Sequence, residues 1–280
     1  MTGKTFNIIS LHPYIKGDIN FIIADKELSP RQKELIKQAK AIILPQGCKA
    51  EIYWFCRWHC PYVFPNYDYR YPGEGKIGDA LLWQTLNLPH PRTIIYPDIH
   101  SFFAIHSLNF DRLPLPFPFV LKGNKGGEGD MVYMIENTRI LEEILNMLSS
   151  LERHHNRHGF IIQEFIPAQT KDLRVIIIGK KRFFFWRIQK GGGWKSNLAQ
   201  GAVIDSDVSL EVQRAITPYL DKLCQKTGIN LAAIDILCPK DKEPLFLEIN
   251  YFFGRRGLGG SERFYQLLEE AVKEWLQGIE

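Results

Sequence analysis

The chain lacks the segments that mark secreted and membrane-spanning proteins. Its 280 residues contain no apolar run near the roughly 20 residues that cross a bilayer, and the opening MTGKTFNIIS carries no signal-peptide core. The five cysteines are Cys48, Cys56, Cys60, Cys224 and Cys238. Their odd number and uneven spacing do not fit a disulfide framework. We therefore expect a cytoplasmic protein with free thiols and no membrane partner.

The sequence is also poor in metal-binding and nucleic-acid-binding patterns. Cys56, His59 and Cys60 lie close together, but a structural zinc ion needs four ligands, usually from two paired clusters, and no second pair exists. Buried thiols on an aromatic helix are the simpler interpretation. Nucleic-acid binding would need a basic stripe with interleaved aromatic residues, whereas the 35 Lys and Arg residues are scattered and the net charge is only +4. We expect no nucleic-acid partner.

Tandem repeats and low-complexity tracts are absent, which excludes a solenoid. The composition that remains is that of an ordinary folded chain, with 45% hydrophobic and 24% charged residues. Eighteen Phe, 11 Tyr and 6 Trp residues can fill a sizeable core. A chain of this length forms one globular unit or two lobes that share a cleft.

The first third of the chain alternates short strands and helices. Strand-like runs are expected at Phe6–Ser10, Ile19–Ala24 and Ala41–Leu44. Ser29 and Pro30 open an amphipathic helix that reaches Lys40, because proline fits the first helical turn. Residues 53–75 are dense in Trp, Tyr, Pro and Gly, so we expect an irregular connection whose aromatic side chains pack rather than bind.

From residue 76 onward strands dominate. A helix is expected at 77–87 and a strand at 92–96. Further strands are expected at Phe117–Gly123, Met131–Glu136, Phe160–Ile166, Leu173–Ile178, Arg182–Gln189, Ala232–Leu237 and Pro244–Asn250. Long helices are expected at 138–152, 209–227 and 261–277, the second kinked or split by Pro218. This pattern indicates antiparallel sheets backed by helices, and repeated prolines place a boundary near 90–115.

A glycine-rich turn follows the apolar strand that ends in Lys122. Glycines at 123–129 let the backbone approach a phosphate group, and a lysine at the strand end supplies a point charge. The segment is neither a Walker A loop, which needs Gly-Lys-Ser/Thr before a helix, nor a dinucleotide fingerprint. A flexible β-turn without a ligand stays open as the alternative.

Polar residues also mark the next strands. The buried strand before residues 163–166 runs into a polar connection, which exposes backbone groups suited to an adenine ring. Asp172 and Arg174 are two residues apart and so share a strand face, where a surface ion pair is the alternative interpretation. Arg187 ends an apolar strand, and its forked guanidinium suits phosphate oxygens.

Asp235, Glu248 and Asn250 form the most informative group. Glu248 and Asn250 face the same way on one strand, and Asp235 lies in an apolar strand close enough in sequence to be its hairpin partner. Carboxylates within apolar strands are costly unless they pair or bind a cation. Three hard oxygen ligands on one face suit magnesium, which takes further ligands from water and nucleotide phosphates. The alternative is three independent positions on an exposed sheet face.

Together these segments resemble the ATP-grasp superfamily, and within it the branch of ribosomal-protein S6 glutamate ligases and glutathione synthetases. The matching order over residues 76–280 is strand–Lys–Gly-rich loop, Gln-Glu-Phe-Ile, Asp-x-Arg, strand–Arg, Asn-x-x-x-Gly, Asp and Glu-x-Asn. The resemblance implies an α+β ATP-grasp fold. It places an N-terminal α/β domain at 1–90 and an ATP-grasp domain at 91–280. The antiparallel sheets that clasp ATP would lie in a central lobe at about 91–165 and a C-terminal lobe at about 166–280.

The resemblance also assigns residues to roles. The nucleotide-binding residues that it implies are Lys76, Lys122, Gly126, Gly127, Gly129, Gln163, Glu164, Phe165, Ile166 and Asp172. The catalytic residues that it implies are Arg174, Arg187 and Asn197. Asp235, Glu248 and Asn250 would bind magnesium or manganese.

The implied chemistry is ATP-dependent formation of a carbon–nitrogen bond. A substrate carboxylate attacks the γ-phosphate of ATP to give an acylphosphate and ADP, and an amine (or a thiol) then displaces phosphate. The substrates would be a small carboxylate and a small amine, with a peptide or protein acceptor and a homo-oligomer left open. A non-catalytic ATP-binding or scaffold protein is the competing hypothesis, although every expected metal and phosphate position is filled.

The chain departs from the family pattern after Asn250, where aromatic residues and an arginine pair appear. We hypothesise that Arg255 or Arg256 binds an anionic group of the substrate. A solvated basic loop is the alternative.

Overall fold

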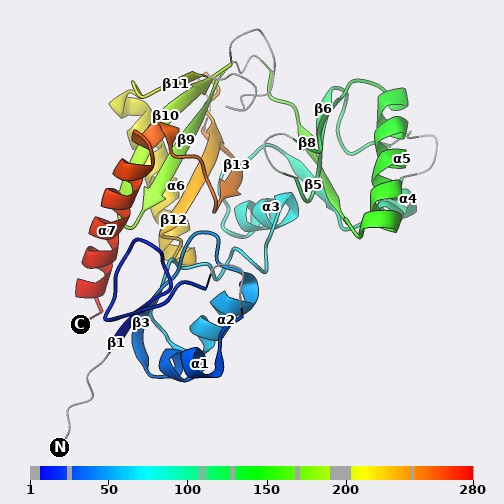
Figure 1. The fold of residues 1–280 in the computed structure, drawn as a ribbon. Coiled ribbons are helices and arrows are strands. Elements are labelled where there is room, and N and C mark those ends of the chain that lie inside the picture. The colour runs from blue at the N-terminus through cyan, green and yellow to red at the C-terminus, as the bar shows by residue number, and fades with distance from the viewer. Residues whose placement is uncertain are drawn as a thin grey trace, which may run out of the picture.

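The computed structural model describes residues 7–23, 27–106, 110, 112–126, 130–167, 171–189, 203–240 and 243–279. In this part of the chain the strands form three sheets, with helices packed against them (Figure 1). The sheets draw their strands from residues 7–64, 93–164 and 171–250, and the predicted division at residues 90 and 165 stays a prediction. Among the described helices, none combines the length and the apolar character that crossing a bilayer requires.

The N-terminal sheet is parallel. Its strand order is β2 (Ile19–Asn20), β1 (Asn7–Ser10), β3 (Ala39–Ile43) and β4 (Val63–Phe64). The connections carry helices α1 (Pro30–Lys37) and α2 (Ala50–His59), as parallel pairing requires crossovers. Helix α1 begins at Pro30 as predicted but ends at Lys37, before the predicted Lys40, because β3 starts at Ala39. Ser29 caps it: its hydroxyl accepts from the N–H of Gln32, and the Gln32 side chain accepts from the N–H of Ser29.

Helix α2 corrects the expectation of an irregular connection at 53–75. Ile52, Tyr53 and Cys56 recur at helical spacing, and all three are buried in the core of the N-terminal sheet. The density of aromatic residues obscured this period. Past β4, residues 65–75 contain no helix or strand, so the prediction was correct there.

The middle sheet is antiparallel. Its strand order is β5 (Thr93–Tyr96), β8 (Phe160–Glu164), β6 (Phe119–Gly123) and β7 (Val132–Ile135). Helices α4 (Ile99–Ile105) and α5 (Thr138–His155) pack on it (Figure 1). The sequence analysis did not anticipate α4, which is capped by Asp98 through a 2.6 Å bond from the N–H of Ser101.

The third sheet is also antiparallel. Its order is β11 (Val203–Asp205), β10 (Lys181–Ile188), β9 (Lys171–Ile178), β12 (Leu231–Leu237) and β13 (Leu245–Asn250). The odd-numbered apolar residues of β9 share a core with α6 (Leu210–Thr227), and the even-numbered Ile176 and Ile178 share one with α7 (Ser261–Gln277). Both faces are covered, which explains the continuous apolar runs. Helix α6 is one element that contains Pro218, so it is not split.

Helix α3 (Lys76–Thr85) lies where the three sheets approach one another (Figure 1). Trp83 anchors it to the third sheet, with its ring centre 5.3 Å from that of Phe246. At its start, α3 is pressed against the preceding turn: a Cβ on Gly78 would lie only 1.7 Å from the carbonyl oxygen of Gly73. The sequence therefore needs glycine at 78 to hold the first turn of α3 in place.

Replacing Gly78 with alanine tests this contact. The added methyl group must push α3 away from Gly73, since backbone lies in its way. We expect Gly78→Ala to lower the free energy of unfolding by about 1–3 kcal/mol in urea denaturation, despite the roughly 1 kcal/mol that alanine contributes within a helix. The control is Gly47→Ala, where no atom lies within 4 Å of the new Cβ. Equal stability of the two variants would contradict the prediction.

Candidate functional site

Five charged side chains share one face at the end of the third sheet. The strand register pairs Asp172 with Arg187, and it places Asp235 between Arg174 on one side and Glu248 on the other. Residues directly opposite one another in an antiparallel sheet point to the same face. The same face of β9 carries Ile176 and Ile178, which pack against α7. The charged side chains lie at the other end of β9, beyond the part that α7 covers.

These side chains form a connected network of ion pairs. Arg174 donates from Nε and Nη2 to Oδ1 and Oδ2 of Asp235, both at 2.7 Å. Arg187 binds Asp172 in the same way, at 2.7 and 2.5 Å. The Nη2 atom of Arg187 also lies 3.1 Å from Oδ2 of Asp235, which joins the two pairs. Bidentate pairs fix orientation as well as charge, and the alternative of an Asp172–Arg174 surface pair is wrong.

Because the network is buried, each charge in it needs its ion-pair partner to stay ionised. Asp172, Arg187 and Asp235 are only 3%, 5% and 5% exposed. Burial by itself would raise the pKa of Asp235, but Arg174 and Arg187 hold that pKa below its ordinary value. Burial would lower the pKa of Arg187, but Asp235 and Asp172 keep it above the ordinary value. Asp235 and Arg187 therefore stay ionised at neutral pH.

The predicted metal ligands lie together on this face. Asp235 and Glu248 are opposite one another on β12 and β13, which confirms the predicted hairpin partnership. The amide nitrogen of Asn250 donates to Oδ2 of Asp235 at 3.2 Å.

The chemistry of this donor set fits a hard divalent cation. Among the described residues, no three His, Cys, Asp or Glu side chains cluster closely enough to hold a metal by themselves. The ion would therefore be bound by two carboxylates, one amide oxygen, and oxygens from water or from a ligand. Glu248 is the most open of the three predicted ligands: its Oε1 atom lies 3.2 Å from Lys76, and no contact of its Oε2 atom is found in the part of the chain that the structure describes. Asp235 keeps a free lone pair on Oδ1, which accepts one bond from Arg174.

Two lysines face this region from other elements. The ammonium of Lys122 on β6 donates to Oε1 of Gln163 at 2.6 Å. Burial lowers the pKa of Lys122 to about 8, and Glu248 offsets this only in part. Lys76, the first residue of α3, is 6% exposed, and its ammonium lies 3.4 Å from the carbonyl oxygen of Gly126. The structure thus brings both predicted lysines towards Glu248.

The segment predicted to meet the adenine ring, residues 163–166, begins with the last two residues of β8. Gln163 is buried and donates to the hydroxyl of Thr93 at 2.9 Å, whereas Glu164 is exposed and accepts from the N–H of Arg92 at 3.3 Å. Phe165 and Ile166 are half-buried. Three further predicted residues, Gly127, Gly129 and Asn197, lie outside the described residues.

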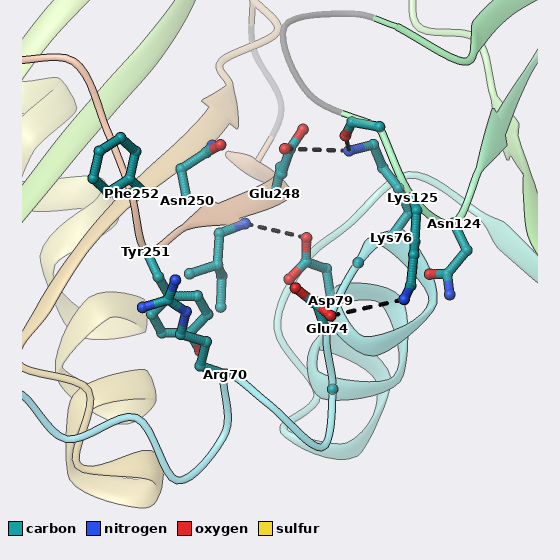
Figure 2. Close-up of a pocket in the computed structure, with 14 residues that line it drawn as sticks. Arg70, Glu74, Lys76, Asp79, Asn124, Lys125, Glu248, Asn250, Tyr251 and Phe252 are labelled. Atoms are coloured by element: carbon teal, nitrogen blue, oxygen red, sulfur yellow. Dashed lines mark hydrogen bonds and ion pairs between the residues drawn. The ribbon is translucent and has the colours of Figure 1, made fainter. Parts of the chain in front are cut away.

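A cavity of about 400 Å³ opens beside this region, between α3, the turn at 70–75, residues 124–126 and the end of β13 (Figure 2). Its lining residues are Arg70, Gly73, Glu74, Gly75, Lys76, Asp79, Asn124, Lys125, Gly126, Glu248, Ile249, Asn250, Tyr251 and Phe252. Of the predicted site residues, Lys76, Gly126, Glu248 and Asn250 line it. Most of the remaining lining was missed by sequence reasoning.

Asp79 is the most buried carboxylate in the cavity lining and was not predicted. It is 7% exposed, and its Oδ2 atom accepts the N–H of Ile249 at 3.3 Å. Burial raises the pKa of Asp79 well above its ordinary value, and the nearby charge of Glu248 raises it further. A signal was available: Asp79 shares the helical face of Ala80 and Trp83, and a carboxylate on a buried face needs an explanation.

The arginine pair and the cysteines singled out in the sequence lie in other surroundings. The guanidinium of Arg255 donates to Ser261 and Tyr265 at 3.2 and 3.0 Å, and Arg256 is exposed; neither lines the cavity. The structure therefore does not place Arg255 or Arg256 at this cavity, and the hypothesis that one of them binds an anionic group of the substrate stays untested; Arg255 holds the start of α7. Cys56 and Cys60 are free buried thiols, and burial raises the pKa of both.

Comparison with known proteins adds family and fold. The RimK-like ATP-grasp domain family matches residues 81–265. The chain is 25% identical over 178 residues to the alpha-aminoadipate–LysW ligase LysX of Saccharolobus solfataricus, covering 63% of this chain and 61% of that protein. It is 29% identical over 143 residues to a probable alpha-L-glutamate ligase of Parasynechococcus marenigrum, covering 50% of this chain. These matches span 61% and 29% of the two relatives' own lengths.

Solved structures share the fold. A RimK domain ATP-grasp protein from Sphaerobacter thermophilus superposes with a TM-score of 0.62 at 14% identity, over 94% of this chain and 98% of that one. The D-cycloserine synthetase DcsG superposes with a TM-score of 0.60 at 15% identity, over 91% of this chain and 88% of that one. The predicted α+β architecture is confirmed.

Asp79 predicts a pH dependence of stability. Its raised pKa means that, above pH 3.8, the folded protein keeps a proton that the unfolded chain releases. The free energy of unfolding should therefore fall as the pH rises towards the folded pKa. Asp79→Asn removes this titration. We therefore expect the difference in free energy of unfolding, variant minus native protein, to be more positive at pH 8 than at pH 5.

Urea denaturation at both pH values measures this difference. Asp207→Asn serves as the control, because Asp207 is an exposed carboxylate. A change in stability for Asp79→Asn that is the same at pH 5 and pH 8 would show that Asp79 does not titrate in this way.

Proposed function

The chain belongs to the RimK-like ATP-grasp family, and from this premise we propose that it is an ATP- and magnesium-dependent ligase that joins a carboxylate to an amine. One observation carries the proposal. The buried pairs of Arg174 and Arg187 with Asp235 lie beside Glu248, so cations and hard oxygen donors share one face. Such a face suits a triphosphate with its metal ion.

Lys76 and Lys122 would neutralise phosphate groups of ATP. Both ammonium groups face Glu248 from other elements, and Lys122 already has a pKa of about 8 because it is buried. An arriving phosphate raises that pKa again and favours the charged form of the lysine. The strand end at 163–166 would hold the adenosine, and Asp172 would act by orienting Arg187.

Asp235, Glu248 and Asn250 would hold the magnesium ion. When bound, magnesium neutralises charge on the phosphates and aligns the terminal one for transfer. Glu248 is the ligand most ready to receive it, since the Lys76 pair engages one oxygen only. Arg174 keeps Asp235 ionised and oriented for this role.

The reaction then needs positioning more than covalent work by the protein. An oxygen of the substrate carboxylate attacks the γ-phosphorus, the bond to the bridging oxygen breaks, and ADP leaves. The amine nitrogen next attacks the acyl carbon, expels inorganic phosphate and loses a proton. Arg187 would stabilise the transferring phosphate through Nη1, because Asp172 and Asp235 occupy Nε and Nη2.

The cavity supports small-molecule substrates. Its volume of about 400 Å³ falls within the range of ordinary ligand pockets, roughly 300–1,000 Å³. It opens next to Glu248 and Lys76, where the reacting phosphate would lie. As part of the proposal, residues 1–90 form a domain that supplies one wall of this cavity, and 91–280 form the ATP-grasp domain.

Release of ADP and phosphate tests the proposed function. The protein is incubated with ATP, magnesium and pools of amino acids and small carboxylates, and both products are quantified. We expect release that requires one carboxylate and one amine. Glu248→Gln should lower the rate about 100-fold or more, because a charged metal ligand is lost.

Glu243→Gln is the matched control, since Glu243 is exposed and does not line the cavity. Tight, magnesium-dependent ATP binding without turnover would instead support the non-catalytic alternative. Turnover that Glu248→Gln leaves intact would refute the assigned site.

A further inference from the structure

The cavity has two ends of different character. One end holds Asp79 and the pair of Lys76 with Glu248, where the reaction is proposed to occur. The other end is formed by Arg70 beside the ring of Tyr251 (Figure 2). We propose that Arg70 binds a second anionic group of the substrate, so that the protein selects molecules with a carboxylate or phosphate besides the reacting group. The assignment to a substrate rests on the proposed function.

Aromatic rings hold the guanidinium of Arg70 in place. Its central carbon lies 4.7 Å from the ring centre of Tyr67, 5.1 Å from that of Tyr71 and 5.9 Å from that of Tyr251. Contacts of this kind fix the planar group without using its N–H donors. The donors therefore remain available for a ligand.

Within the described residues, few of those donors are used. One nitrogen, Nη1, donates to the carbonyl oxygen of Gln46 at 2.5 Å. In contrast, Arg57 and Arg174 each bind a carboxylate, Asp68 or Asp235, at 3.0 and 2.7 Å. No Asp or Glu of the described residues forms such an ion pair with Arg70. A guanidinium has five N–H donors in a fork that matches a carboxylate or a phosphate.

The aromatic surroundings are themselves fixed by hydrogen bonds. The hydroxyl of Tyr71 donates to the carbonyl oxygen of Cys48 at 2.5 Å, and the N–H of Tyr67 donates to the hydroxyl of Tyr53 at 2.8 Å. Tyr67 is fully buried. A cation held this firmly at a cavity wall loses little further freedom when an anion binds. This gives Tyr67 and Tyr71 a role beyond their packing in the core of the N-terminal sheet.

Arg255 provides a matched comparison. It also stacks on aromatic rings, 4.4 Å from the centre of Phe264 and 4.6 Å from that of Tyr265. Its donors, however, bind Ser261 and Tyr265, and it does not line the cavity. The two arginines share their stacking and differ in access to the cavity.

Chemical footprinting tests the anion site without requiring turnover. The full-length protein is treated with phenylglyoxal, which modifies guanidinium groups, and modified peptides are quantified by mass spectrometry. Succinate, glutarate, L-aspartate and L-glutamate are added singly as probes, at an ionic strength held constant with potassium chloride. We expect at least one probe to slow modification of Arg70 by about tenfold while Arg255 is unaffected. If the rate of Arg70 modification is the same with each probe as with potassium chloride alone, the proposal is overturned.

Kinetics then link the site to the substrate. Once ADP release identifies a substrate pair, Arg70→Lys and Arg70→Met should raise the KM of the anionic substrate about tenfold or more, as loss of a bidentate charged contact predicts. The KM for ATP and the kcat should stay near native values, and Arg255→Lys should change none of these. An unchanged substrate KM in Arg70→Lys would overturn the assignment. If a probe protects Arg70 from phenylglyoxal but no substrate pair causes ADP release, the anion site is supported and the ligase proposal is rejected.

Discussion

The ion pairs that converge on Asp235 are the constraint on which the site depends. Arg174 and Arg187 reach this carboxylate from β9 and β10, so one buried charge ties three neighbouring strands together. A slip of one residue in their register would turn every charged side chain to the opposite face. Removal of one partner would leave an uncompensated buried charge, at a cost of about 3–5 kcal/mol. The register of the sheet and the geometry of the site are therefore fixed by the same contacts.

The apolar parts of the chain place this network next to a cavity. Helices α6 and α7 cover the two faces of the third sheet, and the charged end of the strands extends past α7. Helix α3 packs on the same sheet through Trp83 and carries Lys76 and Asp79 to the end of β13. The turn before α3 adds Arg70 from the N-terminal part of the chain. Three separate segments thus meet where phosphate chemistry is proposed.

Features that depend on residues close together in the sequence could be predicted. Apolar runs indicated the strands, and Asp235 and Glu248 face one another as their spacing suggested. Long-range contacts could not be read in this way: the N–H that Asp79 accepts belongs to a residue 170 positions away. Arg70 was hidden in a segment interpreted as packing, and the contacts of Arg255 with the aromatic residues of α7 were not foreseen. Helix α2 was anticipated only around its cysteines, because its aromatic residues obscured the helical period.

Equilibrium binding of ATP tests the central claim most directly. Calorimetric titration of the native protein with ATP, with and without magnesium, should show saturable binding that magnesium strengthens. Asp235→Asn should abolish most of the magnesium effect, because the amide neither carries the charge nor balances Arg174 and Arg187. Denaturation curves establish that the variant is folded at the temperature used. Absence of ATP binding by the native protein, or a magnesium effect that Asp235→Asn leaves unchanged, would contradict the assignment of this network to nucleotide and metal.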